Sequence, residues 1–265
     1  MYEIAEEVRQ EILTGLEKIE AEHRVKVIFA CESGSRAWGF PSKNSDYDVR
    51  FIYAHPIDWY LTVDLEDKRD VIELPIHDDL DISGWDLRKA LKLFRKSNPP
   101  LLEWLGSPIV YWEKYTVAQN MRDLAPIAYS PISCMYHYFS MAKGNFRDYL
   151  RGDTVKLKKY FYVLRPLLGV IWLERQLGVV PTEFQKLIEG TLEDDALKEA
   201  IYRLIERKKV GEELDAGPRI PEISSFIERE ISRLEAEEFE KRAQKAPVEK
   251  LNTLFQDGLN EIWRH

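Results

Sequence analysis

The first part of the chain alternates between helical and extended patterns of apolar residues. Residues 4–22 repeat apolar side chains at helical spacing, which predicts an amphipathic helix. The β-branched stretch VKVIFACE at 25–32 predicts a buried strand that ends at a Gly-Ser turn. A second strand, DYDVRFIYA at 46–54, alternates strictly between two faces. One face carries Tyr47, Val49, Phe51 and Tyr53, and the other carries Asp46, Asp48 and Arg50.

Two further strands are predicted at 70–76 and 80–85, followed by a helix for which Asp86 is the expected cap. Residues 99–112 predict a short helix and one edge strand. Beyond Lys114 nearly every apolar pattern has helical spacing and is interrupted by Pro or Gly. The arrangement predicts an α+β protein with a mixed sheet followed by a helical part.

The change in pattern also predicts two domains. We expect residues 1–112 to form a catalytic domain with a mixed sheet flanked by helices. We expect residues 113–265 to form an all-helical domain that completes the active-site cleft.

Composition narrows the class of protein. The 265 residues are 45% hydrophobic and 32% charged, so the chain can bury a core. Its two cysteines, Cys31 and Cys134, are far apart and lack metal-ligand spacing, which favours a reducing, cytoplasmic setting. The N-terminus has no signal-peptide pattern, and the longest apolar stretch is broken by Arg165 and Pro166. We therefore expect no membrane association.

The net charge of −8 argues against nucleic-acid binding over the whole surface. A local basic stripe is nevertheless predicted, because Lys158, Tyr162 and Arg165 share one helical face at i, i+4 and i+7. Such a stripe would bind a triphosphate tail or an RNA phosphate. A solvated helix face over an apolar core is an equally good interpretation.

Asp46 and Asp48 point the same way from one strand, where two unneutralised carboxylates repel each other. A divalent cation removes this repulsion, and hard oxygen ligands suit Mg²⁺ or Mn²⁺. A third carboxylate on a neighbouring strand would allow two metal ions. Asp81 is the preferred candidate, and Asp79 shares its face. The competing interpretation is a solvated edge strand with its polar residues turned outward.

The Gly-Ser turn before this strand predicts a phosphate site. Backbone N–H groups at the start of a short helix favour phosphate oxygens, and Ser35 adds a hydroxyl donor. Gly34 would allow the backbone to approach the ligand closely. Arg36 would contact phosphate or cap the short helix. Arg50 would either form a salt bridge that positions Asp48 or contact phosphate.

These residues carry a resemblance to a known family. Gly34-Ser35, ten residues, then Asp46-Tyr47-Asp48-Val49 resembles the signature of the DNA polymerase β-type nucleotidyltransferase superfamily. The stretches GWDLRKALKLFRKSNPPLLEWLGSPIVY and KLKKYFYVLRPLL make the chain more similar to nucleotidyltransferases associated with RNA ligase and RNA repair. The similarity covers most of residues 25–185. One departure is Ser33, where superfamily members usually have an apolar residue.

The resemblance implies a metal-dependent enzyme that transfers a nucleoside monophosphate from a nucleoside triphosphate to a hydroxyl acceptor. Ser35 and the backbone at Gly34 would contact the triphosphate, with Arg36, Lys158 and Tyr162 as further nucleotide-binding candidates. Asp46 and Asp48 would bind Mg²⁺ or Mn²⁺, and Asp81 would be the third carboxylate.

The resemblance leaves two hypotheses for the acceptor and one in which the protein is not an enzyme. The first acceptor is an RNA end, which the association with RNA repair implies. The second is a small molecule or a protein, as in other relatives that share the signature. A catalytically inactive nucleotide-binding module is the third hypothesis, and the intact set of carboxylates argues against it.

Overall fold

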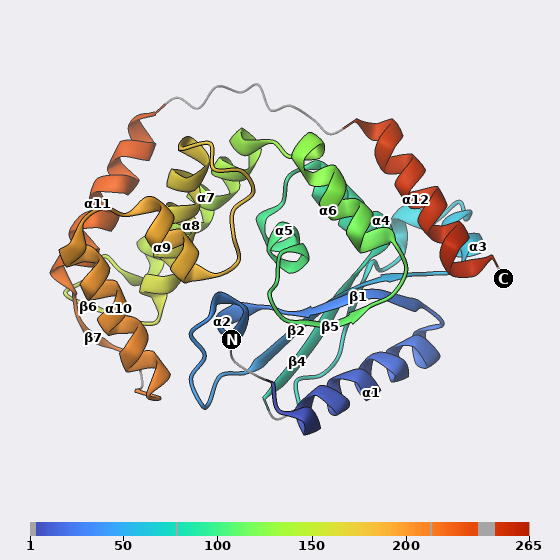
Figure 1. The fold of residues 1–265 in the computed structure, drawn as a ribbon, viewed down its shortest axis with the longest axis horizontal. Coiled ribbons are helices and arrows are strands. Elements are labelled where there is room, and N and C mark those ends of the chain that lie inside the picture. The colour runs from blue at the N-terminus through green and yellow to red at the C-terminus, as the bar shows by residue number, and fades with distance from the viewer. Residues whose placement is uncertain (1–3, 78, 213, 238–246, 265) are drawn as a thin grey trace. The chain divides into compact units, whose positions relative to one another are not determined.

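The protein is described by a computed structural model that covers residues 4–77, 79–212, 214–237 and 247–264. Its elements divide into two units, each discontinuous in sequence (Figure 1). The first consists of Met1–Ala37, Asp46–Tyr129 and Lys245–His265, and we call it the sheet unit. The second consists of Trp38–Ser45 and Ser130–Gln244, and we call it the helical unit.

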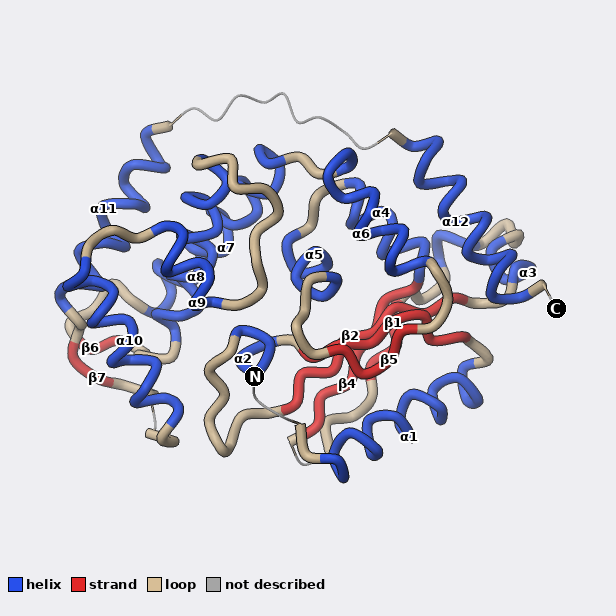
Figure 2. The backbone as a smooth tube through the Cα atoms, viewed as in Figure 1, coloured by secondary structure: helices blue, strands red, loops and turns tan. Residues whose placement is uncertain are grey.

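The sheet unit contains a mixed five-stranded sheet with the spatial order β3-β4-β2-β1-β5 (Figure 2). Its strands are β1 (Lys26–Glu32), β2 (Tyr47–Ala54), β3 (Val71–Glu73), β4 (Leu80–Asp86) and β5 (Val110–Glu113). β2 and β4 run parallel, whereas the other neighbouring strands are antiparallel. The predicted edge strand is confirmed, because β5 lies at one end of the sheet.

Helix α1 (Glu6–His23) covers one face of the sheet (Figure 1). Its apolar stripe of Ile12, Leu16 and Ile19 is fully buried against strand residues. Val49 and Phe51 of β2 belong to this core, as their alternation predicted. The packing of α1 therefore leaves Asp48 and Arg50 on the opposite face of the strand.

Helices from later in the chain cover the other face (Figure 1). They are α4 (Leu87–Arg95), α5 (Pro99–Leu105) and α6 (Val117–Ala128), with α12 (Val248–Trp263) packed on α4 and α6. Asp86 caps α4 as predicted, since its Oδ1 accepts a hydrogen bond from the backbone N–H of Arg88 at 2.8 Å. Three short helical segments complete the unit: α2 (Gly34–Trp38), α3 (Ile57–Tyr60) and the 3₁₀ turn η1 (Leu65–Asp67). The last residue of α2, Trp38, already belongs to the helical unit.

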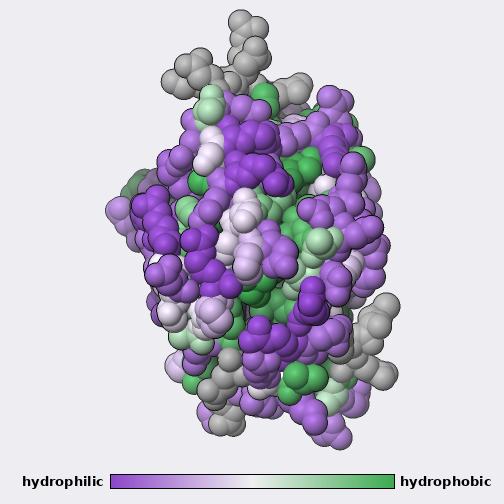
Figure 3. Space-filling model, turned by 90° about the vertical axis from the view of Figure 1, so that its left-hand side faces the viewer, coloured by the Kyte–Doolittle hydropathy of each residue, from purple (hydrophilic) through white to green (hydrophobic). Residues whose placement is uncertain are grey.

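The helical unit is built around α8 (Lys159–Glu174), most of which is buried. Its other helices are α7 (Pro131–Tyr149), α9 (Phe184–Thr191), α10 (Asp195–Lys209) and α11 (Pro221–Ala236). Two short strands, β6 (Thr154–Val155) and β7 (Gly217–Pro218), pair within it. Hydrophilic side chains cover most of the face shown in Figure 3, with smaller apolar areas between them.

The segment Trp38–Ser45 belongs to the helical unit although its neighbours in sequence belong to the sheet unit. Phe40 anchors it, with ring centroids 4.7 Å from Phe161 and 5.5 Å from Phe184. Aromatic contacts of this kind add to the burial of apolar area. The link between the Gly-Ser turn and β2 is therefore held by residues far away in the sequence.

The α+β class, the mixed sheet and the C-terminal helical region are confirmed. The units differ in outline from the predicted domains 1–112 and 113–265, because α6 and α12 belong to the sheet unit and Trp38–Ser45 belongs to the helical unit. The short strands β6 and β7 were not expected. In the described residues, no helix is both long enough and apolar enough to cross a bilayer.

Candidate active site

Asp48 and Asp81 lie side by side on neighbouring strands. β2 and β4 are parallel, and their register pairs Asp48 with Asp81. Paired residues present their side chains on the same face, so the two carboxylates are brought together by the backbone. Asp79, the alternative third carboxylate, is exposed, and its backbone oxygen accepts a hydrogen bond from the N–H of Tyr47 at 2.6 Å. The structure therefore places Asp81, rather than Asp79, beside Asp48.

Arg50 joins the two carboxylates. Its Nη2 donates to Asp48 Oδ1 at 3.0 Å and to Asp81 Oδ2 at 2.7 Å. Its Nη1 donates to the backbone oxygens of Val49 and Asp81, both at 3.0 Å. The salt-bridge interpretation of Arg50 is the one that the structure bears out.

Gly34 lies directly against the Asp48 carboxylate. Its φ of +59° lies in the left-handed region, which favours glycine. A Cβ at this position would be 2.1 Å from Asp48 Oδ2, closer than any side chain can approach. The backbone N–H of Ser33 also donates to the backbone oxygen of Asp48 at 2.8 Å. Glycine is thus required both by the backbone conformation and by the nearby carboxylate. Ser35, the next residue in α2, is half-buried.

Glu32, at the end of β1, is a buried carboxyl group that sequence reasoning missed. It is 0% exposed, and its Oε1 accepts a hydrogen bond from the backbone N–H of Asp48 at 2.9 Å. The hydroxyl of Tyr111 donates to its Oε2. Burial raises the pKa of Glu32 to about 7, although these two hydrogen bonds act in the opposite direction. A charged residue ending an apolar strand just before the Gly-Ser turn was the signal that would have identified it.

Asp46 lies immediately before β2 and is exposed. Its backbone oxygen accepts a hydrogen bond from Arg36 Nε at 3.3 Å. The Arg36 guanidinium lies 3.8 Å from the centroid of the Tyr47 ring, a cation–π contact. Arg36 therefore ties the short helix α2 to the start of β2.

The carboxylates fit a divalent cation in the kind of atom that they offer, because Mg²⁺ and Mn²⁺ prefer oxygen ligands. The predicted set is assembled only in part. Asp48 and Asp81 are together, but within the described ranges no group of three or more His, Cys, Asp or Glu side chains is arranged to hold a metal. The carboxylate of Asp46 is not grouped with the other two, and Arg50 bridges the pair.

Comparison with known proteins identifies the family of this chain. The model of the RNA repair pathway DNA polymerase beta family, RlaP, matches residues 8–257. The chain belongs to this family. Among its relatives is the Bacillus subtilis (strain 168) protein called "Uncharacterized protein YcgL", which is 50% identical over 258 residues, covering 97% of this chain and 98% of the relative.

A solved structure, a nucleotidyltransferase-like protein from Exiguobacterium sibiricum 255-15, matches 96% of this chain and 76% of its own. The identity is 10% and the TM-score is 0.28. Membership of the RlaP family confirms the resemblance to polymerase β-type nucleotidyltransferases.

In this RlaP-family chain, the predicted basic stripe of Lys158, Tyr162 and Arg165 is wrong for Arg165. Lys158 lies just before α8 and is exposed, and Tyr162 is 37% exposed. Arg165 is only 2% exposed, and its Nη2 donates to the backbone oxygens of Pro181 at 3.2 Å and Thr182 at 3.1 Å. Helical spacing placed Arg165 with Lys158, but this part of α8 is buried on nearly all sides.

Basic side chains gather instead in residues 147–159, which contain five basic and two acidic residues. Four of them form no ion pair with a carboxylate in the part of the chain that the structure describes: Arg151, Lys156, Lys158 and Lys159. We call these four the basic cluster. Lys159 Nζ lies 4.5 Å from the ring centroid of Tyr149 and 4.7 Å from that of Tyr162. The cluster therefore combines unneutralised charge with aromatic rings.

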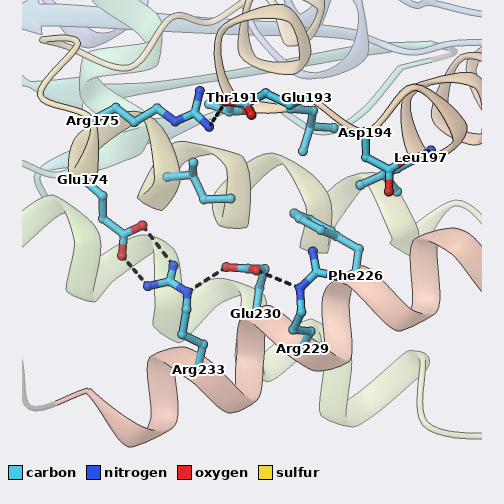
Figure 4. A pocket seen from close by; sticks show the side chains of 12 residues that line it. Glu174, Arg175, Thr191, Glu193, Asp194, Leu197, Phe226, Arg229, Glu230 and Arg233 are labelled. Carbon is cyan, nitrogen blue, oxygen red and sulfur yellow. Dashed lines mark hydrogen bonds and ion pairs between the residues drawn. The ribbon is translucent and has the colours of Figure 1, made fainter.

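A pocket of about 320 Å³ in the helical unit carries charges that neutralise each other (Figure 4). Arg233 Nη1 and Nη2 lie 2.9 Å from the two oxygens of Glu174, and its Nε lies 2.9 Å from the largely buried Glu230. Arg229 also contacts Glu230, and Arg175 contacts Glu193. These pairs are a structural network, and we assign no substrate to the pocket.

Proposed function

We propose that this protein is a metal-dependent nucleotidyltransferase that transfers a nucleoside monophosphate from a nucleoside triphosphate to a hydroxyl group. The observation that carries the proposal is the pairing of Asp48 with Asp81 beside the Gly34 turn. Carboxylates next to a glycine turn provide both the acidic and the phosphate-binding parts of such a site. Membership of the RlaP family supports the same reaction class.

Each residue has a role in the proposed reaction. Gly34 and Ser35 bind the triphosphate, with Arg36 beside them. Asp48 and Asp81 would hold Mg²⁺ or Mn²⁺, which supplies positive charge for the phosphate oxygens when bound. Asp46, which the structure does not group with them, is the third ligand of the predicted set.

The acceptor hydroxyl oxygen forms a bond to the α-phosphorus, and the bond from that phosphorus to pyrophosphate breaks. Asp81 would act as the general base that takes the hydroxyl proton or as a ligand of a second metal ion.

The test is transfer of label from α-labelled nucleoside triphosphates to a panel of RNA ends, small-molecule hydroxyls and proteins. We expect Asp48→Asn and Asp81→Asn to lower the rate by at least about a thousandfold, since each removes a ligand and a charge. Asp79→Asn, immediately before β4, is the matched control and is expected to keep activity. Undiminished transfer by the double variant Asp48→Asn/Asp81→Asn would show that the mechanism is wrong.

For the acceptor, we propose a single-stranded RNA end that is bound through the basic cluster. Lysines without carboxylate partners next to aromatic rings suit phosphate contacts and base stacking. In fluorescence anisotropy, binding should weaken steeply with salt. Lys156→Ala/Lys158→Ala should reduce the slope of log K against log[salt] by about 1.4, or about 0.7 for each lost contact.

Lys186→Ala/Lys198→Ala is the matched control, because both lysines lie on the helical unit but are paired with Glu183 and Asp195. An RNA affinity that does not change with salt concentration, or that is the same in the Lys156→Ala/Lys158→Ala variant as in wild type, would rule out this surface. Transfer to a small molecule or a protein in the acceptor panel, and not to RNA, would show that RNA is not the acceptor. Nucleotide binding without any transfer would favour the inactive binding module.

A further inference from the structure

Arg50 directs most of its hydrogen-bond donors to other groups of the protein. Its Nη1 and Nη2 make four hydrogen bonds, two to carboxylates and two to backbone oxygens. The side chain is only 18% exposed. A guanidinium has five N–H donors, so nearly all of its capacity is used inside the protein. Arg50 is therefore part of the carboxylate site rather than a donor to a ligand.

Arg50 contacts only one of the two oxygen atoms of each carboxylate in the hydrogen bonds described above. Arg50 binds Oδ1 of Asp48 and Oδ2 of Asp81. The other oxygen of Asp48, Oδ2, is the one that lies against Gly34 in the predicted phosphate turn. One oxygen of each carboxylate thus faces a fixed positive charge.

We propose that Arg50 is a built-in counter-cation that competes with a divalent cation for the oxygens of Asp48 and Asp81. Two facing carboxylates without a cation repel each other, and Arg50 removes this repulsion before any metal arrives. A divalent cation at this site would share the two carboxylates with Arg50 and would bind against the repulsion of the guanidinium. This inference rests on the proposed function, because it assigns a role in metal binding to a residue of the same site.

Binding of Mn²⁺ to the whole chain without nucleotide tests the proposal, with free Mn²⁺ followed by electron paramagnetic resonance. Arg50→Gln removes the charge while keeping a hydrogen-bonding side chain. We expect it to bind Mn²⁺ on the order of tenfold more tightly than wild type, the size of the Coulomb repulsion between a single and a double positive charge a few ångströms apart in water. Arg69→Gln, which breaks an exposed pair with Glu73 in the same unit, should leave the affinity unchanged.

Arg50→Lys keeps the positive charge and provides a second variant if Arg50→Gln does not fold, as judged by circular dichroism. Its affinity for Mn²⁺ should stay within about threefold of wild type, because the charge remains. An affinity of Arg50→Gln equal to or below that of wild type, or a tenfold gain in Arg50→Lys, overturns the counter-cation role. If Asp48→Asn still loses Mn²⁺ binding in that case, the proposed metal site stands. If neither wild type nor Arg50→Gln binds Mn²⁺, both the counter-cation role and the metal dependence are overturned.

Discussion

Gly34 and Asp48 are in direct contact: a Cβ on residue 34 would lie 2.1 Å from Oδ2 of Asp48. This contact joins the two parts of the signature, the glycine turn and the acidic strand. Residue 34 also has a φ of +59°, so both its backbone conformation and its contact with Asp48 require glycine. The position of the Asp48 carboxylate therefore depends on a residue that has no side chain.

We predict that Gly34→Ala lowers kcat/KM on the order of a hundredfold. The new methyl group displaces the Asp48 carboxylate, and a shift of about 1 Å at a reacting centre has an effect of that size. Nucleotidyl transfer with a labelled substrate measures it. Gly178→Ala is the matched control, since residue 178 also has a positive φ of +88° but has no atom within 4 Å of its Cβ position. Equal losses of activity in the two variants would attribute the effect to backbone strain alone.

The stability of the protein should fall as the pH rises through the pKa of Glu32. Burial raises this pKa to about 7 in the folded protein, against 4.5 for an exposed glutamate. The folded state then holds a proton that the unfolded state releases. The stabilisation is complete below about pH 4.5 and is lost as the pH rises through about 7, with a slope of up to about 1.4 kcal/mol per pH unit.

Glu32→Gln removes this titration while keeping the shape of the side chain. Urea unfolding between pH 5 and pH 8 should show a shallower loss of stability in the variant than in wild type. The pKa of Asp86, which burial raises to about 6, contributes in the same direction in both proteins, so the difference between them isolates Glu32. Identical pH profiles would mean that Glu32 stays ionised in the folded state.

Arg165 and Lys158 should respond differently to the same substitution. Arg165→Met leaves the backbone oxygens of Pro181 and Thr182 without their buried guanidinium donor. We expect a loss of about 2–3 kcal/mol of unfolding free energy, measured by chemical denaturation. Lys158→Met should change stability by less than about 0.5 kcal/mol, because this side chain is exposed. A stable Arg165→Met protein would contradict the buried role.

The ion pairs of the helical pocket should contribute to stability. Arg233→Met removes the partner of Glu174 and one of the two arginines that contact the largely buried Glu230. We expect a loss of about 1–3 kcal/mol in thermal or chemical unfolding. Arg203→Met is the control, since its pair with Glu199 is exposed and should contribute little. A loss no greater than that of the control would show that the network is dispensable.

The short-range pattern of the sequence predicted the strands of the sheet and the acidic face of β2 that carries Asp48. The alternation around Asp48 identified the buried and acidic faces of β2, because side chains in a strand alternate with period two. The pairing with Asp81 depends on strand register, which local sequence does not encode, although the alternation of Asp81 with Leu80 and Ile82 made Asp81 the preferred choice. The burial of Arg165 and Glu32 depends on tertiary packing, and spacing alone gave no account of it.

The discontinuity of the two units has a consequence for dissection of the protein. Residues 38–45 lie between the glycine turn and the acidic strand, yet they pack in the helical unit, and α12 returns from the far end of the chain to the sheet unit. Cutting any single peptide bond between residues 46 and 244 would leave neither unit on one continuous polypeptide. Truncation is therefore unsuited to separating the proposed nucleotide chemistry from the proposed acceptor binding, and point substitutions or a circular permutant are the tools that this topology permits.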